Sequence, residues 1–118
     1  MSDRYAILVV EDDMLISMEM GERLTDMGYD VVGPAQSLEA AEAAIAARKP
    51  DAALLDANIA GASSVELGAK LAGMGVPVAF CTGYDSVKNL PPSLQHAPIL
   101  TKPISDHDLQ TALKRLLA

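Results

Sequence analysis

Continuous apolar runs alternate along the chain with stretches in which apolar residues recur every three or four positions. A continuous short run is typical of a strand that helices cover on both faces, and the longer spacing is typical of an amphipathic helix. Strands are predicted over residues 6–10, 29–35, 52–56, 76–82 and 99–101. Helices are predicted over residues 14–27, 37–47, 64–74 and 105–117. This alternation predicts an α/β fold with a doubly wound parallel sheet.

Capping residues mark the ends of these helices. Gly28 follows the first helix as a C-terminal cap. Ser37 and Ser105 stand where a side-chain oxygen caps the second and the last helix, and either Ser63 or Ser64 can cap the third. The methionines of the first helix are interpreted as core residues. The loop that precedes the third helix is predicted to run from residue 58 to residue 64 without regular structure.

Glycine and proline limit three of the elements. Gly33-Pro34 ends the second strand, which we expect at a sheet edge because proline cannot donate to an interior ladder. Gly68 costs the third helix about 1 kcal/mol relative to alanine. Pro91-Pro92 breaks any helix between residues 85 and 98, so that segment is predicted to be short or irregular. With this segment as the fourth, the chain has about five helices.

Charged residues follow the buried strands at once. Asp56 ends the third strand, so we expect it to be presented to solvent rather than buried, and Glu11, Asp12 and Asp13 follow the first. Because the carboxyl ends of parallel strands meet at one crevice, these acids should converge. Two like charges about 4 Å apart repel by roughly 4 kcal/mol at an effective dielectric near 20. A divalent cation, or Lys102 after the fifth strand, is therefore expected to offset them.

Composition narrows the possible classes of protein. With 118 residues, 50% of them hydrophobic, we expect one domain over residues 1–118 and no output domain. The net charge of −7 and the nine scattered basic residues argue against nucleic-acid binding. The longest uncharged run, residues 71–84, contains three glycines and a proline, so no membrane insertion is expected. The single cysteine, Cys81, is expected to be a small buried hydrophobe in a cytoplasmic protein.

Four segments resemble the response-regulator receiver domain, the phosphoacceptor half of two-component systems. They are Val9-Val10-Glu11-Asp12-Asp13, Leu54-Leu55-Asp56-Ala57-Asn58, Phe80-Cys81-Thr82-Gly83-Tyr84 and Leu100-Thr101-Lys102-Pro103. The third resembles the Phe-Ala-Thr-Gly-Tyr subfamily of single-domain receivers. The resemblance extends over essentially the whole chain. It implies a flavodoxin-like, five-stranded sheet in the order 2-1-3-4-5.

The resemblance implies a phosphoacceptor and a metal site. Asp56 would hold a phosphoryl group as an acyl phosphate. Mg²⁺ prefers six oxygen ligands and keeps several waters, and here Glu11, Asp12, Asp56 and the backbone carbonyl of Asn58 would bind it. Asp13 would instead cap the first helix.

Further donors are implied at the other two strand ends. Lys102 would act as a point charge on a phosphoryl oxygen, and the hydroxyl of Thr82 would donate to another. Gly83 would leave the approach to the phosphoryl group open. The peptide bond between Lys102 and Pro103 would be cis.

The chain departs from the receiver pattern in several places. Ile99 stands where many receivers have the aromatic residue that turns inward on phosphorylation, and Tyr84 is a candidate substitute for that switch. Ala60 and Ser64 replace a proline and a glycine that are common after the phosphoacceptor. By the same resemblance, Asn58 and Tyr84 occupy positions that in receivers tune the access of water to the phosphoryl group.

Three functions follow from these residues. The first is a receiver that accepts a phosphoryl group from a histidine kinase or a phosphotransfer protein, and then signals to an unknown downstream protein or acts as a phosphate sink. It would be a self-phosphorylating phosphoacceptor capable of autodephosphorylation rather than a conventional enzyme. The second is a pseudo-receiver that binds partners without phosphorylation. The third, an aspartyl phosphatase, is disfavoured because Asn58 stands where those enzymes have a second aspartate.

Overall fold

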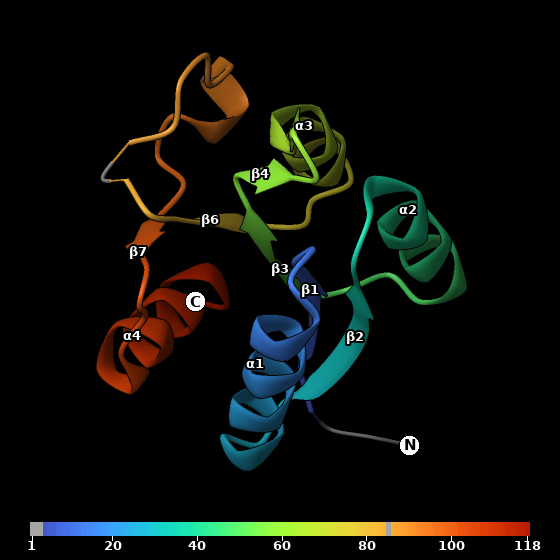
Figure 1. Ribbon diagram of the computed structural model, residues 1–118, viewed down its shortest axis with the longest axis vertical. Coiled ribbons are helices and arrows are strands. Elements are labelled where there is room, and N and C mark those ends of the chain that lie inside the picture. Colours follow the sequence, from blue (N-terminus) through green and yellow to red (C-terminus); the bar gives the residue numbers. More distant parts are fainter. Residues whose placement is uncertain (1–3, 85) are drawn as a thin grey trace.

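Five parallel strands form the central sheet of the protein. The structure, a computed structural model, describes residues 4–84 and 86–118. The sheet has the order β2-β1-β3-β6-β7, which confirms the predicted order of the five strands. The strands are β1 (Ala6–Val10), β2 (Asp30–Ala35), β3 (Ala52–Asp56), β6 (Val78–Thr82) and β7 (Ile99–Thr101). Figure 1 shows β2 and β7 at the two edges, so Pro34 lies on an edge strand as predicted.

Helices cover both faces of this sheet and give the predicted doubly wound α/β fold. They are α1 (Met14–Asp26), α2 (Leu38–Ala47), α3 (Val65–Gly73), α4 (Asp106–Leu116) and the short 3₁₀ helix η1 (Pro92–Leu94). α1 and α4 lie on one side of the sheet, whereas α2 and α3 lie on the other (Figure 1). The segment 85–98, predicted to be short or irregular, contains η1 and no other helix or strand among its described residues. Asp85 lies outside the described residues.

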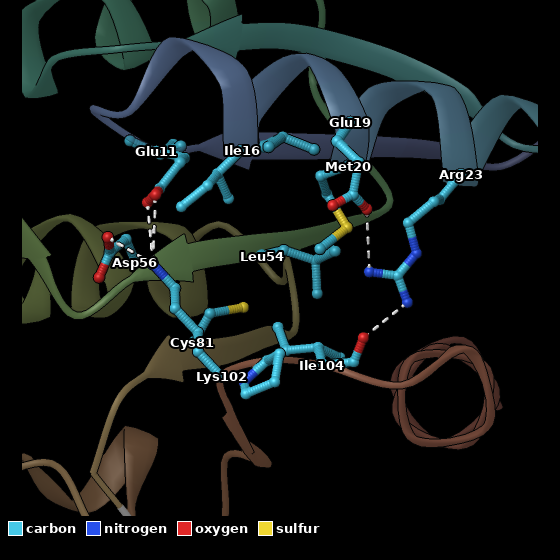
Figure 2. Close-up of a pocket in the computed structure, with 13 residues that line it drawn as sticks. Glu11, Ile16, Glu19, Met20, Arg23, Leu54, Asp56, Cys81, Lys102 and Ile104 are labelled. Atoms are coloured by element: carbon cyan, nitrogen blue, oxygen red, sulfur yellow. Dashed lines mark hydrogen bonds and ion pairs between the residues drawn. The ribbon is translucent and has the colours of Figure 1, made fainter.

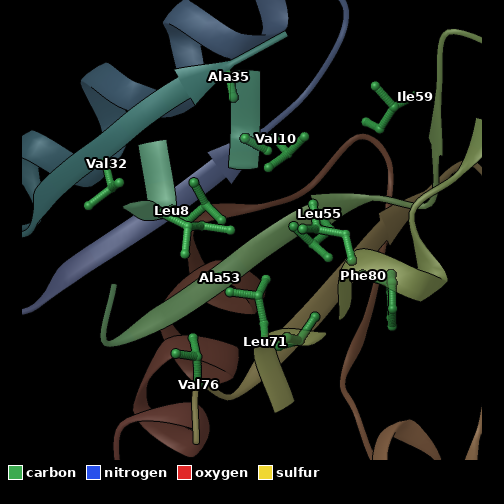
Figure 3. Packing of buried hydrophobic residues seen from close by; sticks show 14 of the residues in the cluster. Leu8, Val10, Val32, Ala35, Ala53, Leu55, Ile59, Leu71, Val76 and Phe80 are labelled. Atoms are coloured by element: carbon green, nitrogen blue, oxygen red, sulfur yellow. The ribbon is translucent and has the colours of Figure 1, made fainter. Parts of the chain in front are cut away.

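Two hydrophobic layers result because successive side chains of a buried strand point to opposite faces. Leu8 and Leu55 pack with α2, α3 and η1, and Figure 3 shows this layer. Ile7 and Leu54, each one residue earlier on the same strands, pack with α1 and α4 instead. All four side chains are buried. The continuous apolar runs of the sequence are therefore explained by burial on both faces.

The predicted caps are largely confirmed. Ser37 Oγ accepts from Ala40 N–H at 3.0 Å, and Ser105 Oγ accepts from Asp108 N–H at 3.1 Å. Asp13 caps α1 through its carboxylate. Gly28 has φ +97, a left-handed conformation that glycine adopts without strain, at the end of α1.

Three predictions need correction. The 58–64 loop contains an antiparallel hairpin, β4 (Asn58–Ile59) with β5 (Ala62–Ser63), because its two central residues adopt the positive φ angles that a two-residue hairpin turn requires. The fourth predicted strand begins at Val78 rather than at residue 76. The methionines of α1 are not all core residues, since Met14 and Met18 lie on its exposed side and only Met20 is buried within that helix.

Gly68, which weakened the prediction of α3, has a packing role. A Cβ at this position would lie 3.0 Å from Cζ of Phe80 and 3.2 Å from Cδ1 of Leu94. The absent side chain therefore lets α3 approach both β6 and η1 closely. None of the helices within residues 4–84 and 86–118 has the length and apolar character needed to cross a membrane.

Candidate functional site

Four strands bring the predicted site residues to one edge of the sheet. The register pairs Val10 with Leu55 and Asp56 with Cys81, so the residues that follow these strands lie side by side. Thr82 in turn pairs with Thr101, directly before Lys102. Figure 2 shows the Lys102 ammonium between the carboxylates of Glu11 and Asp56. The predicted convergence of strand ends is therefore present.

Lys102 forms ion pairs with two acids at once. Its Nζ lies 3.0 Å from Asp56 Oδ2 and 3.2 Å from Glu11 Oε1. The exposed fractions of the side chains are 27% for Lys102, 13% for Asp56 and 7% for Glu11. Asp56 is thus less exposed than its place at a strand end suggested, because the lysine and the next loop cover it. Such partial burial strengthens each electrostatic interaction relative to water.

Burial and proximity separate the pKa values of the two acids. Burial, together with the neighbouring Asp56, raises the pKa of Glu11 to about 7, although Lys102 opposes the shift. Burial also tends to raise the pKa of Asp56, but hydrogen bonds with Glu11, Lys102 and Asn58 outweigh it and hold that pKa below 3.8. The pKa of Lys102 is raised because the two acids outweigh the effect of burial. Asp56 is therefore ionised at neutral pH, whereas Glu11 gains and loses its proton close to that pH.

The acidic cluster fits the ligand set of a hard divalent cation. One carboxylate oxygen from each of Glu11, Asp12 and Asp56 can be chosen so that all three lie within 4.8 Å of one another. Oxygen ligands from one or two carboxylates suit Mg²⁺, which retains water in its remaining positions. Asn58 lies in the same loop, and its N–H donates to Asp56 Oδ1 at 3.2 Å. Its carbonyl as a further ligand stays a prediction.

The segment after β6 supplies the hydroxyl and an exposed aromatic ring. Thr82 is buried, and its Oγ1 accepts from the N–H of Tyr84 at 3.2 Å, which leaves the hydroxyl hydrogen free to donate elsewhere. A Cβ at Gly83 would meet no heavy atom within 4 Å, so the approach is open there. Tyr84 is 78% exposed. Ile99 is half-buried and pairs with Phe80.

Two contacts of the loop after Asp56 were missed from the sequence. Ala60 N–H donates to Asp12 Oδ2 at 2.9 Å, and Ser64 Oγ donates to the carbonyl oxygen of Asp56 at 2.6 Å. Ser64 holds the N-cap position of α3, but its hydroxyl donates to the carbonyl of Asp56 and does not cap the helix. Its complete burial was not visible in the sequence. The Lys102–Pro103 bond is cis, as the resemblance implied.

A pocket of about 340 Å³ extends from this site between α1 and the loop after β7. Arg23 crosses one end of it and donates to the carbonyl of Ile104 at 2.8 Å (Figure 2). Cys81 also lines the pocket, and burial raises the pKa of its thiol to about 12. The prediction of Cys81 as a small buried residue is confirmed. The sequence did not single out Arg23, because an arginine within a helix is usually a solvated residue.

A model of the family "Response regulator receiver domain" matches residues 7–114 of the chain. The positive alginate biosynthesis regulatory protein of Pseudomonas aeruginosa is 31% identical over 113 residues, which cover 92% of this chain and 46% of that protein. The transcriptional regulatory protein PdtaR of Mycobacterium tuberculosis is 28% identical over 112 residues, which cover 92% of this chain and 54% of that protein. The chain spans about half the length of these curated relatives.

Solved structures share the whole fold. SdrG from Sphingomonas melonis Fr1 is 31% identical, and the alignment covers 100% of both chains with a TM-score of 0.81. The receiver domain of the response regulator PhyR from Erythrobacter litoralis is 28% identical, with a TM-score of 0.80 over 97% of this chain and 90% of that chain. The likeness to SdrG covers the whole chain and therefore includes the strand ends that carry the acids, Thr82 and Lys102.

Proposed function

The chain belongs to the response regulator receiver domain family of two-component systems, and from this premise we propose that it accepts a phosphoryl group on Asp56. The observation that carries the proposal is the ion pair of 3.0 Å between Lys102 Nζ and Asp56 Oδ2, beside two further carboxylates. A structural carboxylate needs no such surroundings. A carboxylate that must receive a dianionic phosphoryl group does need such surroundings, because the negative charge of the incoming group has to be offset.

The proposed reaction is nucleophilic substitution at phosphorus. A carboxylate oxygen of Asp56 forms the new O–P bond while the N–P bond of a phosphohistidine on the donor protein breaks, and the imidazole leaves with the bonding electron pair. The donor is a histidine kinase or a histidine phosphotransfer protein. The lowered pKa of Asp56 supports this role because it keeps the nucleophile ionised at neutral pH.

Glu11, Asp12, Asp56 and the carbonyl of Asn58 are the proposed ligands of Mg²⁺. When bound, the ion neutralises negative charge that develops on the phosphoryl oxygens. The close approach of the three carboxylates supports the assignment. Glu11 has the additional role of holding Lys102 in place through contacts of 3.2 and 3.3 Å to its two oxygens.

Lys102 and Thr82 bind the remaining phosphoryl oxygens in this proposal. Lys102 already contacts Asp56 and has a raised pKa, so it carries a full positive charge. Thr82 has a hydroxyl hydrogen available because its oxygen accepts from Tyr84 N–H. Gly83 keeps the space beside the hydroxyl open for the incoming group.

We infer that phosphorylation changes the affinity of the protein for a downstream protein partner, or that the protein acts as a phosphate sink. Tyr84 is the candidate switch, since Ile99 lacks a ring and Tyr84 is exposed two residues beyond Thr82. Loss of the phosphoryl group by autodephosphorylation is part of the same proposal. Asn58 and Tyr84 are the residues expected to set its rate.

The decisive test is the intact mass of the protein after incubation with acetyl phosphate and Mg²⁺. We expect a gain of about 80 Da, which is the mass of one phosphoryl group held as an acyl phosphate. The gain should require Mg²⁺ and should be absent from Asp56→Asn. A phosphorylated histidine kinase serves as the second donor.

The pseudo-receiver is the alternative function. No gain in mass with either donor, for a protein that is folded by circular dichroism, would reject phosphorylation and favour this alternative. A gain that persists in Asp56→Asn would move the phosphoacceptor to another residue.

A further inference from the structure

The loop that joins Lys102 to α4 is fixed at its two ends and spans a pocket between them. Lys102 N–H donates to the carbonyl of Thr82 at 2.7 Å, which fixes the start of the loop to β6. Ser105 fixes its end as the N-cap of α4. Between these points, Pro103 and Ile104 line the pocket of about 340 Å³ beside α1. Because residues that line a cavity lack packing partners on that side, α1 supports this part of the loop less than a packed interface would.

Arg23 of α1 reaches across this pocket and holds the loop. Its Nη2 donates to the carbonyl of Ile104 at 2.8 Å, and its Nε donates to Asp106 Oδ1 at 2.9 Å, at the first residue of α4. Its Nη1 donates to Glu19 Oε1 at 3.2 Å within α1. Because a guanidinium is planar and presents its donors in a fixed arrangement, this one side chain sets the position of the loop relative to both helices.

The contribution of Arg23 to stability is expected to be small. The two carboxylates with which it pairs belong to side chains that are 59% and 72% exposed, and exposed ion pairs contribute little to folding. The hydrogen bond to Ile104 is more sheltered, since the Arg23 side chain is 21% exposed. This contact lies two residues after Lys102, whose Nζ is 3.0 Å from Asp56 Oδ2. Arg23 is therefore better placed to control the position of Lys102 than to stabilise the fold.

We propose that Arg23 is a positioning residue for the phosphorylation of Asp56, because it fixes the loop after β7 and thereby holds Lys102 where it can bind the incoming phosphoryl group. Figure 2 shows Arg23 at the end of the pocket away from Asp56, so Arg23 acts through the loop and not by contact with the reacting atoms. The inference rests on the proposed function, because the rate that Arg23 raises is that of the proposed reaction.

The first test is the rate at which acetyl phosphate phosphorylates the parent, Arg23→Met and Arg48→Met, followed by intact mass at saturating Mg²⁺. Methionine keeps an unbranched side chain in the pocket and removes every donor. Arg48→Met is the matched control, because Arg48 also forms a surface ion pair, with Asp30 at 3.2 Å, and follows α2 outside the pocket. A misplacement of about 1 Å can cost a factor of about 100 in rate, so we expect a fall of about 10-fold in Arg23→Met and of less than about 2-fold in Arg48→Met.

Two further measurements separate positioning from a general change in structure. The Kd for Mg²⁺, from isothermal titration calorimetry, should be unchanged in Arg23→Met, because the partners of Arg23 are Glu19, Ile104 and Asp106. The Lys102 ammonium should give a sharp NMR signal in the metal-free parent and in Arg48→Met, because two carboxylates slow the exchange of its hydrogens. In Arg23→Met this signal should broaden, because the lysine is held less firmly.

Three outcomes would overturn the positioning role. They are an unchanged rate in Arg23→Met, a slower rate with an equal loss of Mg²⁺ affinity, and a slower rate with an unchanged Lys102 signal. If Arg23→Met does not fold, Arg23→Lys is measured in the same way and should also be slower than the parent, because lysine keeps the charge but replaces the planar fork by a single ammonium group. If the parent itself gained no phosphoryl group, the proposed function would fail, whereas the Lys102 signal would still decide whether Arg23 holds the lysine.

Discussion

The connections that follow Asp56 and Thr82 differ sharply in how they are held. The first, residues 57–64, forms a hairpin, donates to two acids of the site and buries Ser64 completely. The second, residues 83–98, is described without Asp85, and most of its hydrogen bonds join near neighbours, as from Leu94 N–H to Pro91. Its hydrogen bonds to distant residues lie at its end, where the carbonyls of His96 and Pro98 accept from Arg115 and from Phe80 N–H. Leu94 is its buried anchor, while Tyr84 at its start is 78% exposed.

This contrast separates two tasks of the site. Ligands and nucleophile must be held in place before reaction, and a loop with many contacts to the acids does that. A segment that reports the reaction must instead be able to change its conformation at low cost, and few buried contacts are the property that permits it. We infer that the first connection serves the chemistry and the second the response.

The largest expected effect comes from Gly68→Val, which would push η1, in the second connection, away from α3. The new side chain would collide with Phe80 and Leu94, where even a Cβ would be 3.0 and 3.2 Å away. Overpacking of this kind costs about 3 kcal/mol at its upper range. Urea unfolding should show this loss, and hydrogen exchange should rise in 86–98 more than in 57–64.

The control lies in the same helix. A Cβ at Gly73 would meet nothing within 4 Å, so Gly73→Ala should leave both connections intact and stabilise α3 by about 0.5–1 kcal/mol. If Gly68→Val loosened the two connections equally, they would not be independent units.

The substitution Glu11→Gln tests how the negative charge of the buried Glu11 changes the stability of the folded protein. Because the pKa of Glu11 rises from 4.5 to about 7 on folding, the folded protein binds more protons than the unfolded chain between these values, and stability falls as the pH rises through this window. Glutamine cannot ionise, so the metal-free variant should be more stable than the parent at pH 8, by about 2 kcal/mol at 1.4 kcal/mol per pKa unit with allowance for partial exposure.

The advantage should shrink as the pH falls and disappear at about pH 4, where Glu11 is neutral in both the folded and the unfolded chain. Urea titrations at both pH values, in the presence of a chelator, measure the difference. A variant that is less stable than the parent at pH 8 would show that the contact with Lys102 outweighs the burial of Glu11.

Ser64→Ala breaks the first connection at one buried bond. Its hydroxyl donates to the carbonyl of Asp56 at 2.6 Å, and loss of a buried hydrogen bond costs about 1.5 kcal/mol. Ser63→Ala is the matched control: Ser63 is exposed and its hydroxyl accepts from Val65 N–H at 3.2 Å, so about 0.5 kcal/mol is expected. Equal losses in urea unfolding would contradict the importance given to Ser64.

The two connections also differ in what the sequence could predict. Asp56 and Lys102 were identified because a charged residue directly after a buried strand must lie at the end of the sheet, and parallel strands bring such ends together. The irregular second connection was predicted because Pro91-Pro92 cannot continue a helix. The β4–β5 hairpin of the first connection was not predicted, since Ala60 has no preference for φ 51° and contributes through its backbone. Long-range contacts made by backbone groups leave no signal in residue type.

The smallest change in stability is expected for Tyr84→Ala, which tests whether the second connection reports phosphorylation. The ring is 78% exposed, so its removal should alter the free energy of unfolding by less than about 0.5 kcal/mol. The N–H that donates to Thr82 belongs to the backbone and remains, so the yield of phosphorylation by acetyl phosphate should also remain. What should diminish is the set of NMR shift changes that phosphorylation causes in residues 86–98. Tyr84→Phe separates the ring from its hydroxyl, and undiminished shifts in both variants would exclude Tyr84 as the switch.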